Sequence, residues 1–408
     1  MSDSPKSNVL ETAESFVSRQ YDFLVVGGGT AGLALAARLS KKTSFTIGVL
    51  EAGQPHLTDL KILAPGLCGA LSGDPEYDWK FMTEHLNGRQ IAKFQTFARP
   101  PAEVAKPLGT SHYRLTDYGG TGPIQIGFYT PHDMQDAWLK TFETLGHRMC
   151  QSPLSGTAIG GFTNLASVDP ESRTRSYSKN AYYLPNATRS AMFVFTGAQV
   201  LKILELFRIG SGDVLFKHGI DVLINNPGVG ENLQDHALAA LAYEVADPNL
   251  SLDRPRDPGL LRTALESFQT EMSDPFTSGV QASAFLPIIE YLQTIAGTEP
   301  LASKLATNGR KIPDCIPVDL DLASAKEEIK KDLATQYHPI GTCAMMPLEK
   351  GGVVEANLTV HGTVNLRVVD VSVFPMHLRG NIQSTVHAIA EYAADMVKAR
   401  WVRSGDLH

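Results

Sequence analysis

The sequence predicts an α/β fold, on three observations within its first 53 residues. Residues 21–26, YDFLVV, form a short aromatic and β-branched run that stops at three glycines, the pattern of a buried parallel strand ending in a tight turn. The stretch at 30–40, TAGLALAARLS, is rich in Ala and Leu and has no breaker after Gly32, which predicts a helix. A second apolar run at 45–53, FTIGVLEAG, completes a β-α-β unit that we expect to cross over in the right-handed sense.

A glycine pattern at the first strand-to-helix turn predicts a dinucleotide-binding, Rossmann-like domain. In a GxGxxG turn the first glycine allows the tight turn, the second lets the backbone approach a pyrophosphate, and the third lets helix and strand pack closely. The helix N-terminus then presents unpaired N–H groups and the positive end of its dipole to phosphates. The residues expected at this position are Gly27, Gly29, Thr30, Ala31 and Gly32.

An acidic residue at the end of the second predicted strand strengthens this interpretation. Glu51 follows Gly32 by roughly the 20 residues expected of a ribose-binding carboxylate. A carboxylate there can accept hydrogen bonds from both ribose hydroxyls and would repel the 2′-phosphate of NADP. The spacing therefore makes a dinucleotide site a much stronger prediction than the glycines alone.

Further along the chain the pattern is irregular, with repeated Pro and Gly. It contains a strand-like segment at 123–129 and a helix-like segment at 132–147, which suggest a second domain of mixed structure. The run at 191–197, AMFVFTG, predicts a strand that returns to the first domain. The Asp and Pro content of 241–260 makes that segment the best linker candidate, and helical apolar spacing begins at Asn381.

Composition and charge exclude several classes of function. The 408 residues carry a net charge of −7 with scattered basic residues, so no nucleic-acid partner is expected. The start of the chain lacks the apolar core of a signal peptide, and no run is long and apolar enough to span a membrane, so we expect a cytoplasmic protein. Four scattered cysteines indicate neither a metal site nor a disulfide framework. They are Cys68, Cys150, Cys315 and Cys343.

Both ends of the chain resemble the glucose–methanol–choline (GMC) oxidoreductases. The resemblance rests on DFLVVGGGTAGLALAARLS with VLEAG at the start, and on YHPIGTCAMMP, GGVVEANLTVHGTVNLRVVDVSVFP and GNIQSTVHAIAEYAADM at the end. Middle segments match as well, among them RSYSKNAYYLPN, FTGAQVLKI and NNPGVGENLQDH. The resemblance implies an FAD-binding Rossmann-like domain, a second α+β substrate domain, and oxidation of the CH–OH group of a small organic alcohol.

The resemblance also implies a discontinuous division of the chain. We expect the FAD-binding domain to comprise 18–72, 191–240 and 335–408. The substrate domain would then comprise 73–190 and 241–334.

Family chemistry transfers a hydride from the alcohol carbon to flavin N5, and the histidine of the YHPIGT motif removes the hydroxyl proton. That position here is His338, and a neutral imidazole is suited to this role. The family places a second His or Asn where this chain has Gln383, which can orient a substrate oxygen but cannot act as a base. His387, one turn further on, is the alternative functional partner, although we expect it to face elsewhere.

Other positions carried over from the resemblance concern the cofactor. Val200 corresponds to a residue whose backbone lies near adenine, and Asp370 to one near the ribityl and pyrophosphate groups. Asn381, in the GNIQS segment, is a further expected cofactor contact. Asn232 and Asp235 are interpreted as structural, through turn and cap chemistry.

Compared with the family pattern, the chain lacks three internal segments. These are a glycine- and serine-rich flavin loop after NGRQIAKF, a hairpin with a strand like VILSAGA after FTGAQVLKIL, and strands of the substrate-domain sheet after SGVQASAF. Loss of the strand would leave an unpaired hydrophobic edge on the FAD-domain sheet. A minimal relative, a pseudoenzyme and a translation with skipped exons would each account for the shortening.

Three functions therefore remain open. The first is an FAD-dependent alcohol oxidoreductase with a role in secondary metabolism. The second is a non-redox isomerase or cyclase that uses His338 as a general acid or base, and the third is a catalytically inactive homologue. The sequence leaves the substrate, the electron acceptor and the oligomeric state undetermined.

Overall fold

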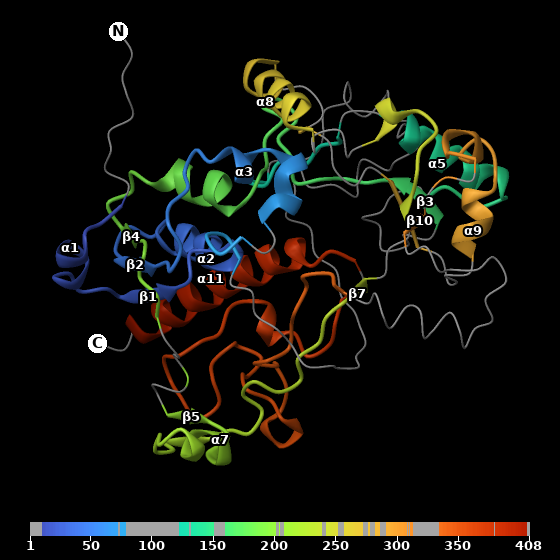
Figure 1. Ribbon diagram of the computed structural model, residues 1–408. Helices are drawn as coiled ribbons and strands as arrows, with labels where there is room; N and C mark the ends of the chain where they lie inside the picture. Colours follow the sequence, from blue (N-terminus) through green and yellow to red (C-terminus); the bar gives the residue numbers. More distant parts are fainter. Residues whose placement is uncertain are drawn as a thin grey trace, which may run out of the picture.

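The computed structural model of the chain is shown in Figure 1. It describes residues 10–71, 74–78, 122–129, 132–150, 160–200, 204, 208–238, 242–251, 257–271, 276–277, 282–285, 291–307, 309, 311–312, 334–378 and 380–405.

A parallel three-stranded sheet forms the centre of the N-terminal region. Its strands are β1 (Phe23–Val26), β2 (Ile47–Leu50) and β4 (Met192–Phe195), in the spatial order β1-β2-β4. Val25 pairs with Val49, which in turn pairs with Val194. The strands predicted at both ends of the β-α-β unit and at 191–197 are confirmed, and the last does return to the first sheet.

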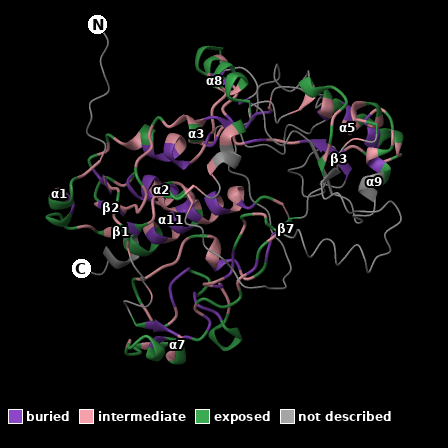
Figure 2. Cartoon of the chain, viewed as in Figure 1, coloured by how far each residue is buried: buried purple, intermediate pink, exposed green. Residues whose placement is uncertain are grey.

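Two helices cover one face of this sheet (Figure 1). They are α2 (Thr30–Leu39), as the sequence predicts, and the long C-terminal helix α11 (Gln383–Gly405), which lie side by side. Small residues allow the close approach, since Ala34 and Ala390 are both fully buried in the same core cluster. Figure 2 shows this buried core between the helices and the strands.

Polar contacts across the two helices add to this packing. Arg38 of α2 donates to Glu391 of α11 at 2.5 Å, and the hydroxyl of Tyr182 donates to the same carboxylate at 2.9 Å. Since all three groups are partly buried, removing one partner would leave a charge or an acceptor poorly solvated.

The opposite face of β1 is open. Leu24 is 54% exposed and Val26 41% exposed, although they belong to a strand of a parallel sheet, which is normally covered on both faces. On this same face the short helix α1 (Ala13–Val17) packs Phe16 against Phe195 of β4, so the cover is only partial. Leu24 and Val26 therefore leave an apolar surface of β1 open to solvent.

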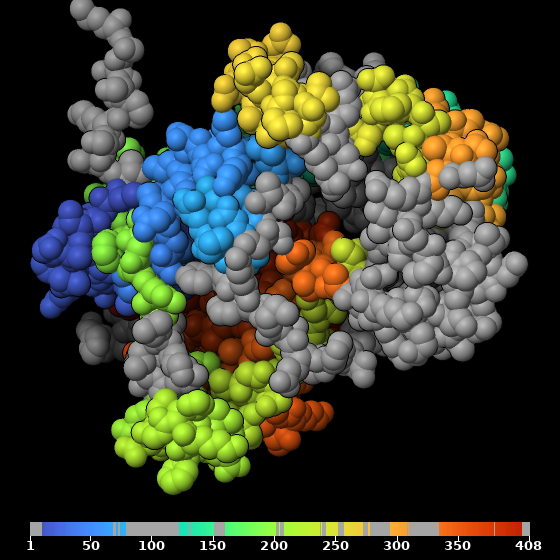
Figure 3. Space-filling view, viewed as in Figure 1, coloured from blue at the N-terminus to red at the C-terminus, as the bar shows by residue number. Residues whose placement is uncertain are grey.

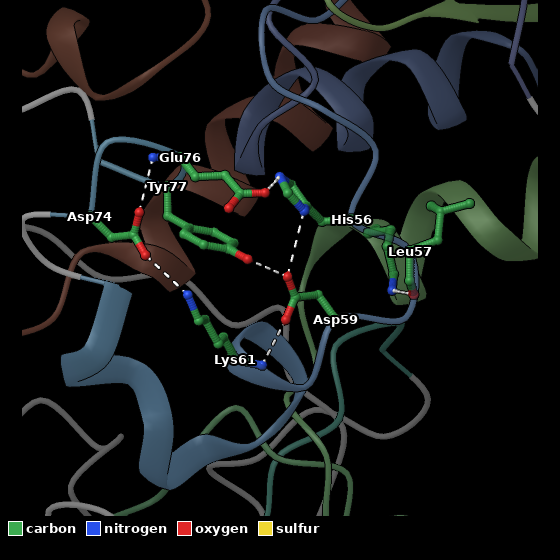
Figure 4. A network of polar contacts seen from close by, with 8 residues as sticks. His56, Leu57, Asp59, Lys61, Asp74, Glu76 and Tyr77 are labelled. Carbon is green, nitrogen blue, oxygen red and sulfur yellow. Dashed lines mark hydrogen bonds and ion pairs between the residues drawn. The ribbon is translucent and has the colours of Figure 1, made fainter.

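A polar network fixes the segment that follows β2 (Figure 4). Asp59 caps α3 (Leu60–Leu63) through the Lys61 amide at 2.8 Å and accepts a hydrogen bond from Tyr77. That bond raises the pKa of Tyr77 to about 12 and lowers the pKa of Asp59. Lys61 in turn contacts Asp74 at 3.0 Å, so residues 74–77 are tied to the start of α3.

A second group of elements lies apart from this sheet (Figures 1 and 3). Strands β3 (Gly160–Thr163) and β9 (Ala282–Phe285) pair antiparallel, beside the predicted helix α5 (Asp133–Thr144). His132 caps α5 by accepting the Met134 amide. The helix α9 (Tyr291–Ala296) packs Ile295 into the same cluster as Phe142 of α5, whereas α8 (Pro258–Glu271) packs Phe268 against the α3 segment.

Two sequence-based expectations for this region are wrong. Among the described residues, the segment 123–129 forms isolated bridges rather than a strand, one of them between Gly127 and Ala166. The expected linker at 241–260 is also paired, since β8 (Ala242–Tyr243) bonds to β10 (Lys311–Ile312). Within its described residues, Asp247 caps a short helix that begins at Pro248, and Asp257 accepts the amides of Gly259 and Leu260.

A third group of short elements packs against α11 around a separate core cluster that includes Ile340, Val353 and Val373. Short strands pair β5 (Ile209–Gly210) with β6 (Ile224–Asn225), and β7 (Ala237–Leu238) with β11 (Ala334–Thr335). The remaining helices of the described residues are η1 (Pro65–Leu71), η5 (Lys179–Tyr183), η6 (Leu184–Asn186), α7 (Gly212–Lys217), η7 (Pro248–Leu250), η9 (Ala302–Lys304), η10 (Leu348–Lys350) and η11 (Val371–Val373). Within the described ranges, no helix has the length and apolar character needed to cross a membrane.

Candidate active site

The glycine turn between β1 and α2 has the geometry that its sequence pattern demands. Gly27 adopts a φ of 97°, and a Cβ on Gly32 would lie 1.8 Å from the Gly27 carbonyl oxygen. Both positions therefore require glycine. In contrast, a Cβ on Gly27 or Gly29 would meet nothing within 4 Å, so open space borders the turn where a ligand can approach.

The start of α2 is free to receive an anion. Gly29 is its N-cap and supplies no side-chain hydrogen bond, and Thr30 and Ala31 begin the helix. The carbonyl of Thr30 accepts a hydrogen bond from Ser178 at 2.9 Å, which holds the turn in place. The first amides of an uncapped helix are suited to phosphate oxygens.

Glu51 lies beside this turn, as its spacing predicts. Its carboxylate accepts the amides of Gly28 at 2.5 Å and Gly53 at 2.7 Å. The Ala198 amide donates to the Glu51 carbonyl at 2.9 Å, which brings the half-buried Val200 segment to the same edge of the sheet. The open glycine turn, the uncapped helix and this carboxylate fit the adenosine and pyrophosphate end of a dinucleotide.

A second set of side chains gathers around His338. The pairing of β7 with β11 brings Asp235 to the His338 segment, where its carboxylate accepts the His338 amide at 3.0 Å and the Thr335 hydroxyl. Tyr337 adopts a φ of 59°, an unfavourable conformation for a bulky residue, just before the histidine. The backbone of His338 is therefore closely constrained by residues about 100 positions away in the sequence.

Two further histidines contact His338. The Nδ1 atoms of His236 and His338 are 3.0 Å apart, and the rings of His236 and His377 are tilted by 40° with centroids 3.7 Å apart. His377 Nε2 lies 2.9 Å from the His338 carbonyl oxygen and its Nδ1 lies 3.1 Å from that of Leu378. The three histidines come from the segments around 236, 338 and 377 and form one group.

The electrostatics around His338 and His236 favour their neutral forms. Burial lowers the pKa of His338, and the neighbouring His236 and His377 lower it further, against an opposing effect of Asp235. Burial and His377 likewise lower the pKa of His236. Among the described residues, no group of three or more His, Cys, Asp or Glu side chains is arranged to hold a metal ion.

The other residues expected from the family resemblance differ in their hydrogen bonds and in their exposure. Gln383 accepts a hydrogen bond from the Ser167 hydroxyl at 2.8 Å through its side-chain oxygen. Asp370 caps η11 by accepting the amide and the hydroxyl of Ser372, and Asn381 is exposed. Asn232, at a φ of 58°, donates to the carbonyl of Pro375, in keeping with a structural role.

His387 lies outside the histidine group, as the sequence predicts. Its ring is fully buried and stacks on Tyr182 at a centroid distance of 5.4 Å, in the core between the helices and the sheet. Both ring nitrogens lack a hydrogen-bond partner, and burial lowers its pKa to about 4. These surroundings belong to the core rather than to a site.

Sequence reasoning did not identify His236 and His377. His236 ends the segment NNPGVGENLQDH, where only Asn232 and Asp235 were considered, and His377 follows the VSVFP segment without any local pattern. Their proximity depends on long-range pairing that neither segment encodes alone. The position after NGRQIAKF, where the sequence lacks the flavin loop of the family, lies outside the described residues.

The fold and these two sites define a class: a dinucleotide-binding α/β protein with a histidine group suited to proton transfer. A family model described as GMC oxidoreductase matches residues 273–390. The chain is 24% identical to a GMC oxidoreductase family protein of Malassezia sympodialis, with 93% of this chain and 92% of the relative covered. It is also 24% identical to a choline oxidase of Arthrobacter globiformis, with 97% of each covered. A formate oxidase structure from Aspergillus oryzae superposes with a TM-score of 0.79 at 18% identity, covering 93% of this chain and 98% of that one.

The family-model match and the likeness to these relatives along nearly the whole chain support membership of the GMC oxidoreductase family, whose members are FAD-dependent oxidoreductases that act on CH–OH donors. FAD is accordingly its cofactor. The alignment with the Malassezia relative extends over 572 positions, whereas this chain has 408 residues. Such an alignment requires long internal gaps in this chain, in agreement with the missing segments inferred from its sequence.

Proposed function

We propose that this chain oxidises the CH–OH group of a small organic alcohol, with His338 as the general base. The observation that carries this proposal is the contact of 3.0 Å between the Nδ1 atoms of His236 and His338. This contact occupies Nδ1 of His338 and leaves Nε2 available to take a proton. The lowered pKa of His338 keeps that nitrogen unprotonated near neutral pH.

His236 determines which nitrogen of His338 carries the proton. It hydrogen-bonds the main chain of Leu378, a contact that raises its pKa and therefore uses an N–H of the ring. A neutral His236 then has one nitrogen left as an acceptor, and Nδ1 faces His338. His338 must donate from Nδ1, so its Nε2 carries the lone pair that a base requires.

The remaining candidate residues would bind either the cofactor or the substrate. The Gly27–Gly32 turn and Glu51 would hold the adenosine and pyrophosphate part of FAD, with Val200, Asp370 and Asn381 as further contacts. When bound, FAD supplies the hydride acceptor at flavin N5. Gln383, held by Ser167, would hydrogen-bond the substrate oxygen while His338 takes its proton.

The discontinuous domain division is part of the same proposal. The segments 18–72, 191–240 and 335–408 would hold the cofactor, and 73–190 with 241–334 would enclose the substrate. Both the sheet order and the clustering around α11 support the first group.

The visible spectrum of the purified full-length chain tests the proposal. We expect a flavin spectrum that bleaches when an alcohol substrate is added without oxygen. A flavin that stays oxidised while an isomer or cyclic product forms would favour a non-redox use of His338. A chain that binds no flavin and converts no substrate would be an inactive homologue.

A further inference from the structure

A cleft of about 610 Å³ lies between the last turns of α11 and the segment 355–367. Its polar lining comprises Glu355, Asn357, Thr359, Thr363, Arg367 and Arg400. Met396 and Ala399 of α11 supply an apolar wall. The cleft is therefore amphipathic, with two guanidinium groups and one carboxylate.

Arg367 is a partly buried cation that is not ion-paired within the described residues. Its Nε atom is shielded from solvent and has no hydrogen-bond partner, and in the described part of the chain no carboxylate forms an ion pair with it. Burial and the nearby Arg400 both lower the pKa of Arg367. An anion bound in the cleft would stabilise this guanidinium, because a partly buried charge without a partner is poorly solvated.

Thr359 is a second residue of the cleft wall with a polar group that lacks a hydrogen-bond partner. Its side chain is 3% exposed, and its amide donates to the Asn357 side chain at 2.9 Å. Its hydroxyl, however, is buried without a hydrogen-bond partner. Buried hydroxyl groups almost always have a partner, so an unpartnered one on a cleft wall points to the cleft as a binding site.

We propose that this cleft binds a small organic acid whose oxyanion group contacts Arg367, Arg400 and the Thr359 hydroxyl. Planar guanidinium groups match both carboxylate and phosphate oxygens, and the hydroxyl adds a donor of the same kind. The apolar wall of Met396 and Ala399 suits an organic body rather than a bare ion. Glu355, which accepts the Asn357 amide group at 3.0 Å, disfavours a ligand of high negative charge.

This site is separate from the proposed redox site. Arg400 lies 17 residues after Gln383 on α11, which corresponds to about 25 Å along the helix axis. The proposal therefore stands whether or not the chain oxidises an alcohol, and its tests need no bound flavin.

Benzoate and phenyl phosphate are suitable probes, titrated by calorimetry into the full chain at low ionic strength. We expect saturable binding of one or both, with the preferred probe distinguishing a carboxylate from a phosphate site. Arg367→Gln and Arg400→Gln should each weaken binding about tenfold or more, as expected for a charge-assisted contact. Arg262→Gln, an exposed arginine on α8, is the matched charge control and should bind as the unmodified chain does.

Two substitutions that keep the side-chain volume distinguish a ligand-binding role of the cleft residues from a purely structural role. Thr359→Val removes only the unpartnered hydroxyl, so it should weaken binding without lowering the thermal midpoint of unfolding. Glu355→Gln removes a negative charge and should tighten binding. The proposal is overturned if neither probe saturates, if Arg400→Gln binds as tightly as Arg262→Gln, or if Thr359→Val binds normally.

Discussion

The Nδ1 atoms of His236 and His338 face each other at 3.0 Å, although the residues are 102 positions apart in the sequence. Two neutral imidazoles can share such a contact only if one donates and the other accepts. Nε2 of His338 can therefore act as a base only if His338 is the donor in this contact and His236 the acceptor. His236 is a positioning residue in this account, because it acts on the substrate only through His338.

The tautomer of His338 can be measured directly in the protein without substrate or flavin. Two-bond proton–nitrogen correlation spectra of the imidazoles should show His338 with its proton on Nδ1. His236→Phe removes the acceptor and should shift His338 toward the Nε2–H form, whereas His236→Asn keeps an acceptor and should preserve the Nδ1–H form. If His338 carries its proton on Nδ1 equally in both variants, His236 has no part in its orientation.

Dinucleotide binding should depend on Glu51. Glu51→Ala should weaken FAD or ADP binding by about 1.5 to 3 kcal/mol, the range for hydrogen bonds to a charged group. Glu143→Ala, an exposed carboxylate on α5, is the control. A loss below about 0.5 kcal/mol would show that the carboxylate does not meet the ribose.

ADP should bind almost as tightly as FAD. The glycine turn and Glu51 are intact, whereas the sequence lacks the expected flavin-proximal loop. Competition titrations measure the ratio. FAD binding more than about a hundredfold tighter than ADP, close to 2.7 kcal/mol, would contradict this expectation.

Much of this cofactor end could be predicted from the sequence because its determinants are local. The strand, the GxGxxG turn, the helix and Glu51 all lie within residues 21–53, and each has its own pattern. The segment at 123–129 shows the limit of such patterns. Its alternation predicts an extended backbone, but whether it forms a ladder depends on a partner that the segment does not specify.

The histidine group illustrates the same limit at the candidate site. His338 was identified through its motif, but the positions of His236 and His377 follow from the β7–β11 pairing and from the course of the chain after η11. Asp235, interpreted as structural, is indeed bonded to the backbone, and the residue that it holds is the proposed base. Contacts over 100 residues leave no trace in local periodicity.

Substrate affinity should respond to Gln383 and its partner. Gln383→Ala should raise KM while leaving the rate of flavin reduction largely intact, since an amide cannot take the hydroxyl proton. Ser167→Ala, which frees the Gln383 oxygen, should raise KM by a smaller factor. A flavin reduction rate that falls more in Gln383→Ala than in a His338 variant would place the base elsewhere.

Stability at acid pH should depend on His387. Its folded-state pKa of about 4 lies below the ordinary value of 6.5, so the unfolded chain takes up a proton more readily than the folded one. Stability should therefore fall as the pH drops from 6.5 toward 4, by up to roughly 3 kcal/mol from this group. His387→Phe keeps a ring against Tyr182 and should remove this part of the loss in urea unfolding curves. Equal acid sensitivity in the variant and the unmodified chain would show that other groups cause it.

Anaerobic rapid mixing of the flavin-loaded chain with an alcohol substrate tests the central claim most directly, by following the loss of visible flavin absorbance. With His338 as the base, His338→Ala should slow flavin reduction by roughly 10²–10⁴-fold. His218→Ala, an exposed histidine after α7, should react at the unmodified rate. The reduction efficiency of the unmodified chain should rise with pH through a single pKa below the ordinary histidine value, because burial and the neighbouring histidines lower that of His338. A His338→Ala chain that keeps most of its reduction rate would contradict the account and show that another group takes the proton.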